Sequence, residues 1–204
     1  MPLSATLVLI GVTVAVSLLA MNNEKLLDRL IFWPPAVARG GEYQRFVTYG
    51  LVHADAAHLL FNMITLYFFG RATEALIAAK LGPFGFYLFY IAALIVSILP
   101  SYFRHRDDSR YRSLGASGAV SAVLFAFILL QPWALIFVFF VPMPAILYAV
   151  IYVAYTIWAD RRGGDSINHS AHLWGGAFGV AALLVMEPSI VSHFLRQLGN
   201  PRFG

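Results

Sequence analysis

The chain has 204 residues, of which 60% are hydrophobic and only 12% are charged, and its formal net charge is +4. Soluble globular domains average about 45–50% apolar and about 25% charged residues, so this composition indicates an integral membrane protein with one domain. Because the sequence contains no cysteine, it excludes a disulfide framework, a thiol nucleophile and a cysteine-based metal site. Most of the charges lie in short loops, which is typical of membrane-flanking charge, and we expect no nucleic-acid partner.

Apolar runs that reach the roughly 20 residues of a membrane-spanning helix recur along the chain. The first begins almost at Met1 without a basic leader and is interpreted as a retained helix. We expect an all-α integral membrane fold, a single domain over 1–204, with six transmembrane helices. The expected helices cover residues 3–20, 56–78, 81–103, 115–131, 144–160 and 167–187. Residues 133–143, between the fourth and fifth helices, are expected to form an apolar interfacial connection.

The segment 21–55 is too long for a plain connection between two helices. Its aromatic residues, such as Phe32 and Trp33, favour a loop that lies in the membrane interface. Six passes place both termini on one side and the loops 21–55, 104–112 and 160–166 on the other. These three loops hold ten of the fourteen Lys and Arg residues. By the positive-inside rule alone, this charge bias would make the three loops cytoplasmic.

Polar residues inside transmembrane segments are costly and mark functional candidates. Ser117 stands in the tetrapeptide Gly115-Ala116-Ser117-Gly118 at the start of the fourth expected helix. On its own, this tetrapeptide is more typical of two helices that pack closely through small residues. It also differs from the G-x-S-x-G elbow of the α/β-hydrolases, because position 119 is alanine.

His172, Gly175, Gly176 and Gly179 are spaced i, i+3, i+4 and i+7 in the sixth expected helix, so they share one face. Glycines there let a neighbouring helix approach closely. The fourth and sixth helices start from the same side, which places His172 at a depth similar to that of Ser117. A serine that faces an imidazole is the minimum for base-assisted nucleophilic attack, whereas a histidine hydrogen-bonded for packing is the structural alternative.

His58 and Asn62 are spaced i, i+4 at the start of the second expected helix, on the same side as Ser117. Two neutral donors aimed at one point would hold an oxyanion, and an interhelical hydrogen-bonding pair is the alternative. Arg71 and Glu74, in the second half of that helix, are expected to be structural, either as a pair or by reaching the interface.

Taken together, these motifs resemble those of the rhomboid family of intramembrane serine proteases. The stretches that carry the resemblance are HADAAHLLFNM and GRATE in the second helix, GASGA in the fourth and AHLWGGAFG in the sixth. The resemblance covers nearly the whole chain and implies a serine endopeptidase with a six-helix rhomboid-like bundle. It implies that Ser117 is the nucleophile and His172 the general base. It further implies that His58, Asn62 and the backbone N–H of Ser117 stabilise the oxyanion.

The resemblance also implies structural roles for a further group of residues, which are Gly115, Gly118, Gly175, Gly179, Arg45 and Glu74. Two positions depart from the family pattern. Gln44 replaces the tryptophan that precedes the arginine, and Ser121 stands where many relatives carry an aromatic ring that stacks on the imidazole. Another group must therefore hold His172. Asp165 or Asn168 would be able to orient it, although the family pattern contains no third member.

The resemblance implies that the substrates are single-pass transmembrane proteins and that the lipid bilayer surrounds the protein. It implies a multi-pass protein of a bacterial plasma (inner) membrane, with the active site toward the extracellular side and cytoplasmic termini, in conflict with the charge bias of the loops. It implies no cofactor and no metal.

Other functions stay open at this point. A catalytically weak or inactive rhomboid-like protein would bind membrane clients without cutting them. A zinc protease built on His53, His58, His169 and His172 would need H-E-x-x-H, where the sixth helix has H-S-A-H. A transporter would need repeated halves or paired broken helices, and the sequence shows neither.

Overall fold

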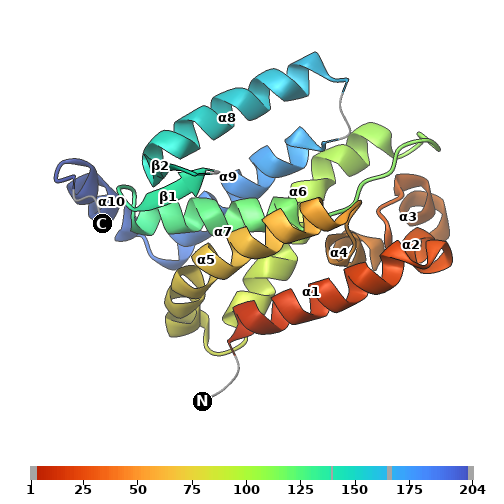
Figure 1. Cartoon of the computed structure of the whole chain (residues 1–204), viewed down its shortest axis with the longest axis horizontal. Helices are drawn as coiled ribbons and strands as arrows, with labels where there is room; N and C mark the ends of the chain where they lie inside the picture. Colours follow the sequence, from red (N-terminus) through yellow and green to blue (C-terminus); the bar gives the residue numbers. More distant parts are fainter. Residues whose placement is uncertain (1–3, 139, 165–166, 202–204) are drawn as a thin grey trace.

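The structure is a computed structural model that describes residues 4–138, 140–164 and 167–201, most of them helical (Figure 1). The long helices are α1 (Ala5–Met21), α5 (Ala56–Leu81), α6 (Gly85–His105), α7 (Ser117–Leu130), α8 (Ala145–Arg162) and α9 (His169–Met186). The shorter elements are α2 (Glu24–Leu30), α3 (Pro34–Gly40), α4 (Arg45–Thr48), the 3-10 helix η1 (Tyr49–Leu51), β1 (Leu135–Val138), β2 (Val141–Pro144) and α10 (Ile190–Leu198). Each long helix overlaps one of the six ranges expected to span the membrane. By length and hydropathy α6 and α9 are sufficient to cross it, whereas α1 and α7 are apolar but shorter.

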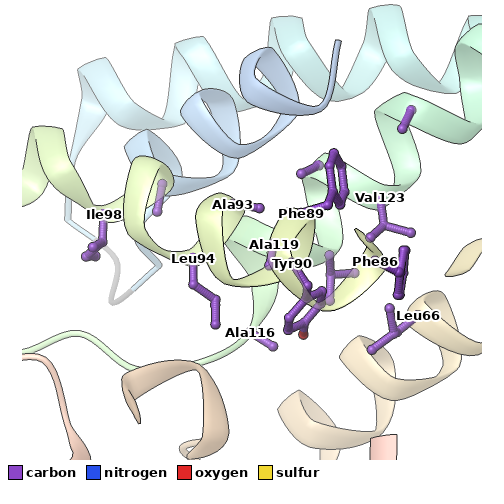
Figure 2. Close-up of a cluster of buried hydrophobic side chains, with 14 of the residues drawn as sticks. Leu66, Phe86, Phe89, Tyr90, Ala93, Leu94, Ile98, Ala116, Ala119 and Val123 are labelled. Atoms are coloured by element: carbon purple, nitrogen blue, oxygen red, sulfur yellow. The ribbon is translucent and has the colours of Figure 1, made fainter. Parts of the chain in front are cut away.

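Helix α7 lies at the centre of the bundle, where it packs against α9, α6 and α5. Ten of its fourteen residues are buried. It is rich in alanine and other small residues, so neighbouring helices approach it closely. Figure 2 shows the apolar core beside it, in which Phe89 and Ala93 of α6 cluster with Ala119 and Val123 of α7. A helix that is apolar on all sides lies in a protein core or in a membrane, and most of α7 is buried against its neighbours.

The segment 22–55 folds into α2, α3, α4 and η1 around one buried arginine. Arg45 is only 6% exposed, and its guanidinium donates to the carbonyl oxygens of Asp28 at 2.7 Å and Ile31 at 2.6 Å. The same guanidinium pairs with Glu42 at 2.7 Å. Because a buried arginine needs several acceptors, these contacts fix the chain around it, and they form although Gln44 stands in the preceding position.

The side chain of Glu74 on α5 caps the start of α1. Its carboxylate accepts hydrogen bonds from Ser4 Oγ at 2.6 Å, the backbone N–H groups of Ala5 and Thr6 at 2.7 and 3.0 Å, and Thr6 Oγ1 at 2.7 Å. The first N–H groups of a helix have no intrahelical acceptor and carry partial positive charge, so a carboxylate stabilises them. Glu74 therefore joins α5 to α1, a contact that the expected pairing with Arg71 did not include.

The connection between α7 and α8 contains an antiparallel hairpin, which the expected all-α fold lacked. Leu135 pairs with Pro144 and Val138 with Val141. β-branched and aromatic residues in β1 favour a strand, and proline is tolerated in β2 because a two-stranded sheet has only edges. The interfacial connection at 133–143 was predicted from its lack of charge, and that property does not distinguish a hairpin from irregular chain.

Candidate active site

Ser117 and His172 meet where α7 and α9 begin. Ser117 is the first residue of α7, and His172 lies in the first turn of α9. The Oγ of Ser117 is 2.8 Å from Nε2 of His172. When the imidazole is neutral and carries its proton on Nδ1, the serine hydroxyl donates to Nε2. This is the geometry in which an imidazole acts as a base toward a serine.

Glycines bring these two helices into backbone contact. A Cβ on Gly175 would overlap the carbonyl group of Gly118, and a Cβ on Gly179 would overlap the carbonyl group of Ala122. Because backbone atoms cannot move aside as a flexible side chain can, only glycine fits at either position. The approach of α9 to α7, which joins the serine to the histidine, therefore depends on these two glycines.

His58 and Asn62 of α5 reach the same place from a third helix. Asp55 caps the start of α5 by accepting a hydrogen bond from the backbone N–H of His58 at 2.8 Å. His58 and Asn62 line a cavity of about 540 Å³ together with Ser117 and His172. Asn62 Nδ2 donates to the backbone carbonyl of His58 at 2.9 Å, which uses one of its two donors. The structure thus gathers all four expected site residues around one cavity.

Gly115 packs directly against His58. Its φ is +111°, in the region that favours glycine, and a Cβ there would lie 2.6 Å from Cε1 of His58. Both the backbone turn and the close contact therefore require glycine. The turn leads into the N-terminus of α7, whose first N–H groups have no intrahelical acceptor and carry partial positive charge. This helix end borders the cavity at Ser117.

The chain that leads into α7 is held by the segment 22–55. Phe32 and Ser113 exchange both backbone hydrogen bonds, at 2.9 and 3.1 Å. The N–H of Gly115 donates to the carbonyl of Tyr49 at 2.9 Å. Segments far apart in the sequence therefore fix the approach to the serine through backbone contacts, and residue patterns alone do not reveal such contacts.

His53 is a site residue that the sequence analysis considered only as a zinc ligand. It is 2% exposed, and its Nε2 accepts from the backbone N–H of Ala116 at 3.3 Å. Its Nδ1 shares a hydrogen bond with Ser17 Oγ of α1 at 2.9 Å. Because Ala116 directly precedes Ser117, this imidazole holds the chain next to the serine. The only sequence signal was its position shortly before His58, and that spacing did not identify its partners.

The stability of the protein is expected to depend on pH through His53, which lies outside the expected membrane-spanning helices. Burial, and then the nearby His58, lower the pKa of His53 from 6.5 to about 4. Near pH 6.5 the unfolded chain binds a proton at His53 and the folded chain does not. The contribution of His53 to the free energy of unfolding is therefore full above pH 6.5, and it decreases as the pH falls toward 4. The melting temperature of the wild type should therefore fall more steeply between pH 6.5 and 4 than that of His53→Gln. Parallel curves for the two proteins would contradict this assignment.

Asn168, one of the two residues considered for orienting the imidazole, caps the start of α9. Its Nδ2 donates to Tyr111 Oη at 2.9 Å and to Ser101 Oγ at 3.0 Å. These contacts hold the start of α9 to α6 and to the loop before α7, four residues before His172. Asp165, the other residue considered for orienting the imidazole, lies outside the described residues.

The fold and the site together define a helical bundle in which a serine and a histidine from two helices meet at a cavity. The family model described as the Rhomboid domain matches residues 40–189, which is most of the chain. This chain belongs to the rhomboid family, and it is accordingly a membrane-embedded protein.

Curated relatives show the same affiliation. The chain is similar to "RHOMBOID-like protein 12, mitochondrial" of Arabidopsis thaliana, with 35% identity over 159 residues, 71% of this chain and 46% of that protein. It is similar to "Rhomboid protein 1, mitochondrial" of Saccharomyces cerevisiae, with 34% identity over 137 residues, 63% of this chain and 37% of that protein. It is also 36% identical over 80 residues to YdcA of Bacillus subtilis, whose name marks it provisionally as a rhomboid protease; the match covers 39% of this chain and 37% of YdcA. The matched region thus spans less than half the length of each of these relatives.

Proposed function

We propose that this chain is an intramembrane serine endopeptidase that acts through Ser117 and His172. The observation that carries the proposal is the 2.8 Å contact between Ser117 Oγ and His172 Nε2 at a cavity that His58 and Asn62 also line. A serine and a histidine that are paired only for packing need neither a cavity next to them nor further hydrogen-bond donors that line the cavity. The contact therefore favours catalysis over a client-binding protein without activity.

In the proposed reaction, His172 Nε2 takes the proton of Ser117 while Oγ attacks the scissile carbonyl carbon. The tetrahedral intermediate collapses, the peptide C–N bond breaks, and the imidazolium returns the proton to the leaving amine. Water then attacks the acyl-enzyme with His172 again as the base, which releases the carboxylate product and restores Ser117. A cavity of about 540 Å³ has room for this water, since one water molecule takes about 30 Å³ in the liquid.

Charge that develops on the carbonyl oxygen requires donors that are already in place. We assign this role to the backbone N–H of Ser117, at the positive end of α7, and to the side chains of His58 and Asn62. These groups come from two helices whose relative position is fixed by packing, so they need little rearrangement as the oxyanion forms.

We infer that the substrates are single-pass transmembrane proteins and that α1, α5, α6, α7, α8 and α9 cross the bilayer. Both termini then lie on the inner side of the membrane, with the site toward the outer side. The positive charge of the loops opposes this orientation under the positive-inside rule. Acidic residues in the same loops reduce the conflict only slightly, because they count little under that rule. The names of the relatives, two mitochondrial and one bacterial, give no support to the bacterial plasma membrane expected from the sequence, so the proposal does not include the compartment.

The proposal is tested with the purified full chain and a model substrate that has one transmembrane segment. The wild type should release two fragments and should be labelled by a serine-directed fluorophosphonate. Ser192→Ala, on the exposed face of α10, is the control and should behave as the wild type. Substrate that binds but stays intact, with no label on the protein, would establish the client-binding alternative and overturn the proposal.

A further inference from the structure

A serine at position 121 has no ring to stack on the imidazole of His172, and a ring from another helix lies nearly parallel to that imidazole. Ser121 is one turn after Ser117 on α7 and is 4% exposed. Its Oγ shares a hydrogen bond of 2.9 Å with the hydroxyl of Tyr152 on α8. The ring of Tyr152 lies almost parallel to the imidazole of His172, with the centroids 6.2 Å apart and the planes at 17°.

Tyr152 is itself held on several sides. Its ring lies 5.8 Å from that of Phe125 on α7 and 5.5 Å from that of Tyr148, one turn earlier on α8. The hydrogen bond to Ser121 fixes the far end of the ring. Rings with centroids 4.5–7 Å apart in an offset parallel arrangement attract each other beyond what their burial contributes. A ring held in this way restricts the plane of the imidazole that lies against it.

We propose that Tyr152 is a positioning residue for His172, and that Ser121 acts through it. The hydrogen bond to Ser117 fixes where Nε2 points, and the ring of Tyr152 fixes the rotation of the imidazole about that direction. The aromatic group that many relatives carry at the position of Ser121 is here supplied by α8, and Ser121 holds its hydroxyl. This inference rests on the proposed function, since it concerns the base of the same reaction.

The assignment explains why a serine occupies position 121. A larger side chain that followed the direction of Ser121 Oγ would meet the hydroxyl of Tyr152, which already lies 2.9 Å from that oxygen. The serine is small enough to leave room for that ring, and its hydroxyl gives the buried hydroxyl of Tyr152 a hydrogen-bond partner.

The test compares Tyr152→Ala, which removes ring and hydroxyl, with Tyr152→Phe, which keeps the ring. We expect Tyr152→Ala to lower kcat by about 10² with KM changed less than about 3-fold, because a small displacement of a catalytic group costs this much. Tyr152→Phe and Ser121→Ala should each retain kcat within about 5-fold. The pH profile of kcat/KM should shift in Tyr152→Ala, because the environment of the base changes. Trp158→Ala removes a half-exposed ring of the same helix that packs against Tyr155 and Arg162, and kcat should fall less than about 5-fold.

A second measurement separates this inference from the proposed function. In the wild type, the ring current of Tyr152 should shift the NMR signals of the His172 ring protons. This shift should vanish in Tyr152→Ala and persist in Trp158→Ala. If the wild type cleaves substrate and Tyr152→Ala keeps its kcat, the inference is wrong while the proposed function stands. An equal loss of kcat in Trp158→Ala and Tyr152→Ala would also overturn it, because general packing of α8 would then explain both. If the wild type cleaves nothing, the proposed function fails, and unchanged ring-proton signals in Tyr152→Ala would reject the ring contact as well.

Discussion

Ser117→Ala is expected to lower kcat for cleavage of a transmembrane substrate by on the order of 10⁴- to 10⁶-fold, the range found when the nucleophile of a serine hydrolase is removed. Alanine keeps the small volume that α7 needs at its start, so the folded structure should survive. KM should change little, because the hydroxyl contributes to the reacting state more than to binding of the substrate. The measurement is single-turnover cleavage with a melting curve for each protein. A Ser117→Ala protein that keeps a tenth of the wild-type rate would contradict the assignment of the nucleophile.

The partner of the serine is identified by a double replacement. His172→Ala alone should cost nearly as much as Ser117→Ala, and Ser117→Ala with His172→Ala should cost no more than the larger single loss. Residues that act as one unit show this strong non-additivity, whereas two independent contributions would multiply. Multiplied losses in the double variant would show that the 2.8 Å contact is structural and that each residue acts separately.

Gly175→Ala is expected to have the largest effect on stability. Its added methyl group would overlap the carbonyl group of Gly118 on α7, where backbone meets backbone and no side chain is able to move away. Overpacking of a filled interior costs about 1–3 kcal/mol, and a contact between two backbones should reach the upper end of this range. Activity should fall as well in the protein that remains folded, because α9 must move away from α7 and takes His172 with it.

The matched control for this replacement is Gly11→Ala on α1. A Cβ at Gly11 would meet nothing within 4 Å, so the same chemical change should leave the free energy of unfolding unchanged or raise it slightly. Unfolding of both variants in detergent, followed by circular dichroism, gives the comparison. Equal stability of Gly175→Ala and Gly11→Ala would show that the two helices are less tightly packed than the structure indicates.

Much of the site was accessible from the sequence because it depends on regular helices. The spacing of His172, Gly175 and Gly179 predicted one face in a close helix contact, and the structure places both glycines against the backbone of α7. His58 and Asn62 share a face by the same rule. Their common depth followed from counting residues from the ends of apolar runs. Periodicity and length determine such features locally, and the fold then only has to bring the helices together.

The parts that were missed depend on contacts between segments without a regular pattern. The contact between His53 and Ala116 depends on the path of the irregular chain next to each of these residues. Tyr152 contacts His172 because of the rotation of α8 about its own axis, and an uncharged apolar run does not encode that rotation. The hairpin of β1 and β2 was missed because apolar strands and apolar irregular chain have the same composition. Tertiary geometry decided all three.

Helix α7 is unusually short for a helix at the centre of a membrane protein. Its 14 residues correspond to about 21 Å, whereas the hydrocarbon core of a bilayer is about 30 Å thick. Its far end is held in place by α10, where His193 Nε2 donates to the carbonyl of Leu130 at 2.8 Å. On the proposed function, α7 extends from one membrane surface to Ser117. Its length then sets the height above that surface at which the serine lies. Such an enzyme would select the bond that a substrate presents at a given height in the bilayer, so lengthening the substrate's helix by one residue would move the cut along its sequence.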